Sequence, residues 1–177
     1  MNNIGKDELV FDRGAGRLKV AEFDYTPEGG TTKKWVGIRL ADAVAVVAQH
    51  DDGSITFVEQ IRPVIKQVII ELPAGLIDKD ELHSVAAARE LREETGLTAA
   101  HWRYLGGIWP SPGITDEQIH LWLATGLTQG EQELDEDERI NLRRISAEDI
   151  ENMVSQGTIR DGKTLLALHL AKTVLRR

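Results

Sequence analysis

Polar and apolar residues alternate through the first forty positions of the chain. The segments LVFDRG, RLKVAEFDY and KWVGIRL follow this two-residue period, and glycine-rich turns such as PEGG separate them. Because successive side chains of a strand point to opposite faces, the pattern predicts short, half-buried strands. We therefore expect residues 1–42 to form a small N-terminal antiparallel β subdomain.

A continuous apolar run, AVAVVAQ, covers residues 43–49 and predicts a buried strand. DDGS predicts a turn after it, so that ITFVEQIR returns as the hairpin partner. KQVIIELPAG predicts another strand, which Pro73 and Gly75 end, and we expect further strands near 104–109 and 119–124. The acidic sequence GEQELDEDERIN predicts a loop.

A helix is predicted between Ser84, as its N-cap, and Gly96, as the residue that follows its last turn. Two more helices are expected at 147–155 and 162–175, where Asp161 would be the N-cap and the leucines would pack. Strands with few helices between them indicate an α/β (α+β) architecture with a mixed sheet. We expect residues 43–177 to form one domain of this class.

Glutamates crowd one side of the first predicted helix. At about 100° per residue, Glu90, Glu93 and Glu94 fall within roughly 100° of one another. Like charges four residues apart destabilise an isolated helix by roughly a few tenths of a kcal/mol, whereas a bound divalent cation would reverse that sign. We expect Ala86 and Ala87, on the same side, to leave room for metal, water and substrate. The opposite side carries Val85, Ala88, Leu91 and Thr95.

The composition narrows the classes of function. The 177 residues include no cysteine, which excludes disulfides, thiolate metal sites and cysteine nucleophiles, and the five histidines lack metal-ligand spacing. The net charge is −8 and the pI about 5.1, so the average surface would repel nucleic acid and attract multivalent cations. The N-terminus lacks the pattern of a signal peptide and no apolar run is long enough to span a bilayer, so we expect a cytoplasmic protein without a membrane partner.

The segment from Gly75 to Leu97 resembles the Nudix box, G-x5-E-x7-R-E-U-x-E-E-x-G-U, in which U is a bulky aliphatic residue. Every fixed position matches without an insertion, and a chance match has a probability of about 10⁻⁸ per starting position at average residue usage. The matching residues are Gly75, Glu81, Arg89, Glu90, Leu91, Glu93, Glu94, Gly96 and Leu97.

The resemblance implies the Nudix fold, a mixed β-sheet sandwiched between helices, and hydrolysis of a nucleoside diphosphate linked to another group. It implies that Glu90 and Glu94 bind Mg²⁺ or Mn²⁺ together with the carbonyl of Ala74, and that Glu93 assists catalysis. Such an ion neutralises phosphate oxygens and lowers the pKa of water bound to it. It implies structural roles for Gly75, Glu81, Arg89 and Gly96: Gly75 permits a backbone turn at the entrance of the loop, and Arg89 pairs with Glu81 to hold the loop in place.

Segments that flank the box are similar to those of the ADP-ribose pyrophosphatase subgroup. WPSPGITDE, at 109–117, matches a proline-containing loop, and VEQIRP carries Arg62 where the subgroup contacts substrate phosphates. LDEDERI matches a loop that supplies carboxylates; it implies Glu136 as the catalytic base and Glu138 as a metal ligand, with the reverse order and Asp137 as alternatives.

The N-terminal strands of the subgroup form a dimerising subdomain, so the resemblance implies a homodimer. It implies that Trp35 stacks on the adenine base and that Glu117 contacts either the terminal ribose or a metal-bound water. We therefore expect hydrolysis of ADP-ribose to AMP and ribose 5-phosphate. The alternatives are hydrolysis of another nucleoside diphosphate sugar, such as a GDP- or UDP-sugar, hydrolysis of oxidised nucleoside triphosphates, and a non-catalytic ligand sensor.

Overall fold

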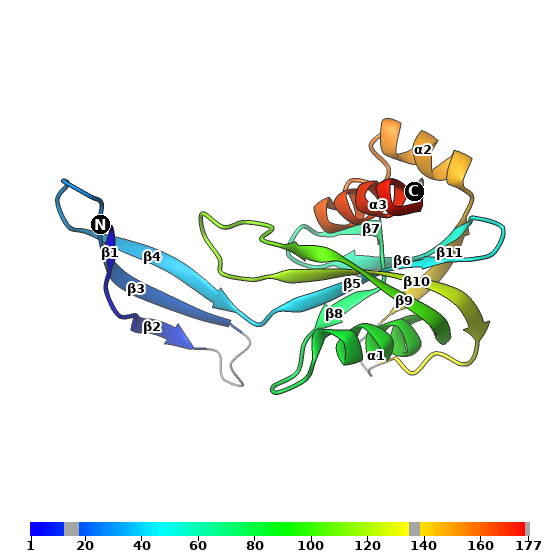
Figure 1. The fold of residues 1–177 in the computed structure, drawn as a ribbon, viewed down its shortest axis with the longest axis horizontal. Helices are drawn as coiled ribbons and strands as arrows, with labels where there is room; N and C mark the ends of the chain where they lie inside the picture. Colours follow the sequence, from blue (N-terminus) through cyan, green and yellow to red (C-terminus); the bar gives the residue numbers. More distant parts are fainter. Residues whose placement is uncertain (13–17, 135–138, 176–177) are drawn as a thin grey trace. The chain divides into compact units, whose positions relative to one another are not determined.

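The computed structural model describes residues 1–12, 18–134 and 139–175 (Figure 1). Within these ranges the strands form two sheets, one of four strands and one of seven. The chain divides into two compact units, and the loop that contains Pro110 and Pro112 groups with the N-terminal strands. The first unit comprises Met1–Asp42 and Trp109–Gln118, and the second comprises Ala43–Ile108 and Ile119–Arg177.

The first unit is an antiparallel sheet, which confirms the strands that the sequence predicts, although burial does not alternate along them: β2 is exposed throughout. The strand β3 lies at the centre and pairs with each of the others. A bridge between Ile38 and Thr115 and a hydrogen bond from Ile38 N to the Ile114 carbonyl (2.8 Å) tie the loop 109–118 to this sheet. The strands are β1 (Asn3–Ile4), β2 (Glu8–Asp12), β3 (Leu18–Thr26) and β4 (Lys33–Leu40).

The second unit contains a mixed sheet with the strand order β11-β6-β5-β10-β9, to which β7 adds on β6 and β8 on β5. The central pair, β5 and β10, is parallel, and the other pairs are antiparallel. The strands are β5 (Ala43–Gln49), β6 (Ile55–Arg62), β7 (Gln67–Glu71), β8 (Ala74–Leu76), β9 (Leu97–Ile108), β10 (Ile119–Gln129) and β11 (Ile140–Ile145).

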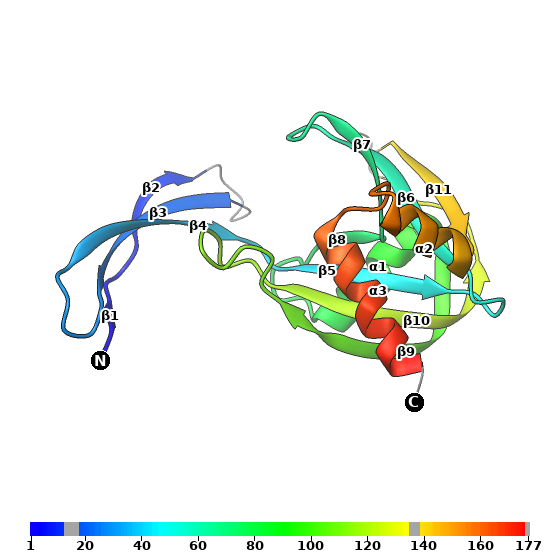
Figure 2. The ribbon, with the colours of Figure 1, turned by 90° about the horizontal axis from the view of Figure 1, so that it is seen from above.

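Helices cover both faces of this sheet: α1 (His83–Thr95) lies on one face, and α2 (Ala147–Ser155) and α3 (Gly162–Leu175) lie on the other (Figure 1). Figure 2 shows α3 crossing the central strands. The buried strand β5 contributes to the apolar cores on both faces of the sheet, because its alternate side chains pack into two different apolar clusters. No helix in the described ranges is long and apolar enough to cross a membrane.

The structure confirms the buried strand at 43–49, its hairpin partner and the two C-terminal helices at the predicted bounds. The strand β11 was not predicted, because only its first and last residues, Ile140 and Ile145, are buried. Its exposed arginines instead form ion pairs with residues of β6 and of the β5–β6 turn. The strand β8 was also missed, and both β9 and β10 are longer than predicted.

Three predictions about α1 are wrong. The helix begins two residues earlier than predicted, with Leu82 as an N-cap that makes no side-chain hydrogen bond, so Ser84 is not the cap. Ala86 and Ala87 do not border open space, because both are fully buried against β5. Val85, on the side predicted to be apolar, is 54% exposed. The end of the helix is as predicted: Gly96 has φ +71°, and its N–H donates to the Arg92 carbonyl at 2.7 Å.

Candidate active site

The short strand β8 meets the acidic side of α1. The backbone N–H of Ala74 donates to Glu94 Oε2 at 2.8 Å. A Cβ atom on Gly75 would lie 2.1 Å from Glu90 Cδ and 2.2 Å from both of its carboxylate oxygens. Gly75 has no positive φ, so its place in the box is explained by this close approach and not by the turn that the sequence predicts.

The two glutamates that face β8 are buried, Glu90 at 9% and Glu94 at 3% exposure. Glu93 lies nearer the solvent, where it contacts the guanidinium groups of Arg89 and Arg92. Burial of a carboxylate costs several kcal/mol or more unless partners compensate its charge. Two buried glutamates one helical turn apart are therefore a feature that packing alone would disfavour.

Arg89 holds the loop and the acidic helix together. Its guanidinium makes a bidentate pair with Glu81, with Nε–Oε1 at 3.0 Å and Nη2–Oε2 at 2.9 Å. The same group donates to the Leu76 carbonyl at 2.9 Å, to Glu90 Oε1 at 2.7 Å and to Glu93 Oε2 at 3.0 Å. The hydrogen bond from Arg89 lowers the pKa of Glu81, and the bond to Glu81 is the main cause that raises the pKa of Arg89.

Replacing Glu81 with glutamine is expected to lower the free energy of unfolding by about 1–3 kcal/mol at pH 7. Because the pKa of Glu81 is lower in the folded protein, its charge stabilises the fold above its unfolded pKa of about 4.3, and the contribution is lost as pH falls through the folded pKa. Urea unfolding of both proteins at pH 7 and pH 3 should therefore show a difference that shrinks at pH 3. The exposed Glu131→Gln variant is the control; an equal loss for Glu81→Gln at both pH values would contradict this role.

Arg62 lies at the end of β6 in a second charged network. Its Nε donates to Glu71 Oε1 at 2.7 Å, and the fully buried Glu71 also pairs with Lys163 at the start of α3. Although burial alone would lower the pKa of Arg62, the hydrogen bond and charge of Glu71 raise it, and the charges of Glu94 and Asp161 act in the same direction. The guanidinium is thus held charged within the field of the acidic helix.

Glu71 and Lys163 were not predicted from the sequence as part of the site. The available signal was a carboxylate at the end of the apolar strand QVIIE, where an unpaired charge would be costly. Asp161 caps α3 as predicted, because its Oδ2 accepts from Thr164 N at 3.0 Å, and it also pairs with Lys163 at 3.1 Å. The Thr164 hydroxyl donates to the same oxygen and accepts from the backbone N–H of Leu72.

The stem of the acidic loop is attached to the C-terminal end of α1. The backbone N–H of Glu133 donates to the Glu93 carbonyl at 3.0 Å, and Gln132 Nε2 donates to the Glu94 carbonyl at 2.6 Å. Arg92 Nη1 contacts both carboxylate oxygens of Glu133, at 2.9 and 3.0 Å. The predicted catalytic carboxylates that follow this stem, Glu136 and Glu138, and the alternative Asp137 lie outside the described residues.

Two predicted substrate contacts belong to the first unit. Trp35, on β4, is 49% exposed and makes an edge contact with Tyr25 at a centroid distance of 5.8 Å. Glu117 lies in the loop 109–118 and is half-buried. Exposure leaves the ring of Trp35 available for stacking, which a core tryptophan would not be.

The described residues contain no group of three or more histidine, aspartate and glutamate side chains placed to hold a metal ion. The chemistry of the donors present nevertheless fits a divalent cation of the Mg²⁺ class. Glu90 and Glu94 supply carboxylate oxygens. The Glu90 carboxylate occupies the space beside Gly75 that a side chain at position 75 would fill. Mg²⁺ prefers oxygen ligands and keeps several waters, so it needs few ligands from the protein.

The NUDIX domain model matches residues 39–168, and the chain belongs to the Nudix family. Among similar proteins are an ADP-ribose pyrophosphatase of Bacillus subtilis (strain 168), 37% identical over 91% of this chain and 87% of that protein, and a methanol dehydrogenase activator of Bacillus methanolicus, 36% identical over 92% and 88%. A GDP-mannose pyrophosphatase of Salmonella typhimurium is 35% identical over 95% and 93%. The crystal structure of an ADP compounds hydrolase, 22% identical, superposes with a TM-score of 0.87 over 99% of this chain and 94% of that one, which confirms the Nudix fold.

Proposed function

We propose that the protein hydrolyses the diphosphate bond of ADP-ribose and releases AMP and ribose 5-phosphate. The observation that carries the proposal is the pair of buried glutamates, Glu90 and Glu94, which face the side-chain-free backbone at Gly75. The ADP-ribose pyrophosphatase of B. subtilis, similar over most of both chains, supports this choice of substrate. Proteins of this family act on phosphorus anhydrides, whose negative charge requires compensation at the site.

In this proposal Glu90, Glu94 and the carbonyl of Ala74 hold Mg²⁺ or Mn²⁺. The ion would neutralise phosphate oxygens, orient the diphosphate and lower the pKa of water bound to it. Arg89 keeps the acidic helix and the loop after β8 in one arrangement, so that the carboxylates are placed before substrate arrives. Glu93 assists catalysis from the solvent side of the same helix.

The loop after β10 supplies the remaining carboxylates in this proposal, with Glu136 as the base that takes a proton from the attacking water and Glu138 as a metal ligand. The bonds from Gln132 and Glu133 to the last turn of α1 support it. The loop therefore starts within reach of the acidic helix.

Arg62 is proposed to bind the substrate phosphates. Replacing it with alanine is expected to raise KM for ADP-ribose about tenfold with a smaller change in kcat, because a charge-assisted hydrogen bond to phosphate contributes about 1.5 kcal/mol or more. Glu71 keeps Lys163 as a partner in the variant, which protects the fold. Steady-state kinetics, with the exposed Arg160→Ala as the control, measure this; an unchanged KM would exclude the contact.

We further propose that Trp35 stacks on the adenine base, that Glu117 contacts the terminal ribose, and that the first unit mediates a homodimer in the cytoplasm. The exposure of Trp35 supports the stacking role. A stacked base is stabilised by about 1–3 kcal/mol, so Trp35→Ala should weaken binding of adenosine-containing substrates. Light scattering of the whole chain tests the homodimer, and the KM of Trp35→Ala for ADP-ribose tests the stacking role.

Hydrolysis of a GDP-sugar is the second candidate, because the similar GDP-mannose pyrophosphatase covers nearly the whole chain. Product analysis with ADP-ribose, GDP-mannose and UDP-glucose, each with Mg²⁺ and with Mn²⁺, separates the candidates. We expect ADP-ribose to have the highest kcat/KM and EDTA to abolish turnover of all three. Faster turnover of GDP-mannose would replace the first candidate with the second, and turnover that persists in EDTA would contradict a metal-dependent site.

A further inference from the structure

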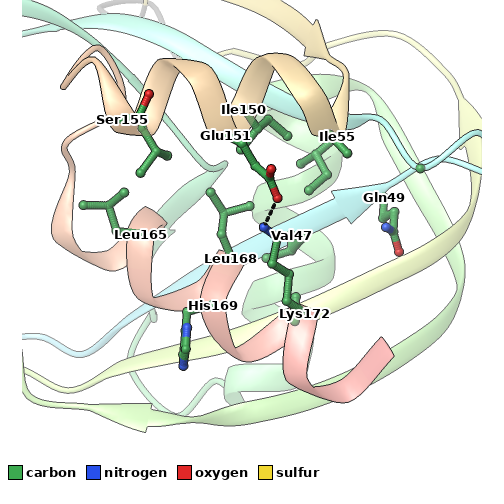
Figure 3. Close-up of a pocket in the computed structure, with 14 residues that line it drawn as sticks. Val47, Gln49, Ile55, Ile150, Glu151, Ser155, Leu165, Leu168, His169 and Lys172 are labelled. Atoms are coloured by element: carbon green, nitrogen blue, oxygen red, sulfur yellow. Dashed lines mark hydrogen bonds and ion pairs between the residues drawn. The ribbon is translucent and has the colours of Figure 1, made fainter. Parts of the chain in front are cut away.

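A pocket of about 580 Å³ lies between α2, α3 and the sheet (Figure 3). Both helices lie on the face of the sheet opposite α1 (Figure 1). Its floor is formed by the buried side chains of Val47 and Ile55, and its helical walls include Ile150, Leu165 and Leu168. Small-molecule sites typically measure roughly 300–1,000 Å³ and are mostly apolar with a few polar groups. Both the size and the lining therefore suit a small molecule with an apolar body.

Polar groups are confined to a few positions around this pocket. Glu151 of α2 and Lys172 of α3 form an ion pair across it, as the dashed line in Figure 3 shows. Three lining side chains carry N–H donors: Gln49, His169 and Lys172. Glu151 is the one carboxylate among the lining residues, and it already accepts from Lys172.

We propose that this pocket binds an amphipathic carboxylate, with its apolar body over Val47 and Ile55 and its carboxylate at Lys172. Two basic side chains, His169 and Lys172, line the pocket against one acidic side chain, Glu151, and this balance favours an anionic head group over a cationic one. Glu151 and Lys172 are both largely exposed, so their pair contributes little stability and a ligand carboxylate can replace Glu151 at small cost. The site is separate from the glutamates of α1, because the sheet lies between them (Figure 1).

The test uses the full chain, with sodium octanoate as the probe. 1-Octanol is the reference that has the apolar body without the charge, and sodium acetate is the reference that has the charge without the apolar body. Titration followed by methyl NMR should shift the resonances of Val47, Ile55 and Leu168, and octanoate should bind at least about tenfold more tightly than either reference. Equal binding of octanoate and 1-octanol, or no shift at these methyls, would overturn the proposal.

Four variants separate the parts of the proposal. Lys172→Ala should weaken octanoate about tenfold while leaving 1-octanol within about twofold, and Glu151→Gln, which removes the competing carboxylate, should tighten octanoate. Val154→Trp, at a partly exposed lining position, should fill the pocket and block both molecules. The distant Lys79→Ala is the control for charge. If Val154→Trp binds octanoate as tightly as the parent protein, the assigned ligand class is wrong. It is also wrong if the methyl resonances of the pocket shift with protein concentration, as self-association would cause, and not with octanoate.

Discussion

Replacing Glu94 with glutamine is expected to lower kcat for ADP-ribose about a thousandfold, because the loss of a metal-binding carboxylate removes about 4 kcal/mol of transition-state stabilisation. The fold should survive. The amide oxygen of glutamine can accept the hydrogen bond from Ala74 N that Glu94 Oε2 accepts now. A neutral amide is also easier to bury than a carboxylate, so Tm should not fall.

Steady-state kinetics at saturating Mg²⁺, with thermal unfolding of the same samples, measure this effect. The matched control is Glu131→Gln, which makes the same chemical change at an exposed position near the stem of the acidic loop. The control should retain the kcat of the parent protein. Retained activity in Glu94→Gln with an intact fold would remove Glu94 from the metal site.

Replacing Gly75 with alanine is expected to lower kcat/KM about a hundredfold while changing Tm by only a few degrees. The added Cβ would overlap the Glu90 carboxylate, which is 2.1–2.2 Å from the position of that atom. Because the carboxylate is the far end of a flexible side chain, the overlap is relieved when Glu90 turns away. The variant should therefore lose metal affinity and activity without losing its fold.

The control for this substitution is Gly162→Ala, at the start of α3, where an added Cβ meets no atom within 4 Å. A helical alanine in open space should leave activity unchanged and stabilise the fold by about 0.4–1 kcal/mol. Mn²⁺ titration of the parent protein, Gly75→Ala and Gly162→Ala distinguishes a loss of metal affinity from a general effect of adding a methyl group. A Gly75→Ala protein with normal Mn²⁺ affinity would show that the position of Glu90 does not matter for the metal.

The parts of the fold that local patterns control could be predicted from the sequence. The apolar run at 43–49 specifies a strand buried on both faces, and Asp161 specifies the start of α3 through its bond to the Thr164 amide. The box also predicted that α1 carries glutamates close together on one side, and Glu90 and Glu94 both face β8. In each of these cases the residues that decide the outcome lie within a few positions of one another.

The parts that were missed depend on partners far away in the chain. The helical period shows which residues share a side of α1 but not that this side is buried: Glu94 is buried with Ala74, twenty residues earlier, donating its backbone N–H to the carboxylate. Glu71 is buried because Lys163, from the last helix, reaches it. The strand β11 likewise exists through pairing with β6, since its own residues are mostly polar.

Diffraction from a crystal soaked with Mn²⁺ and a non-hydrolysable ADP-ribose analogue would test the proposed arrangement of carboxylates, metal and diphosphate most directly. The expected result is an anomalous peak about 2–2.3 Å from carboxylate oxygens of Glu90 and Glu94, with the diphosphate of the analogue beside it. If the analogue binds while both carboxylates keep only their protein partners and every manganese peak lies elsewhere, the site has been assigned to the wrong residues.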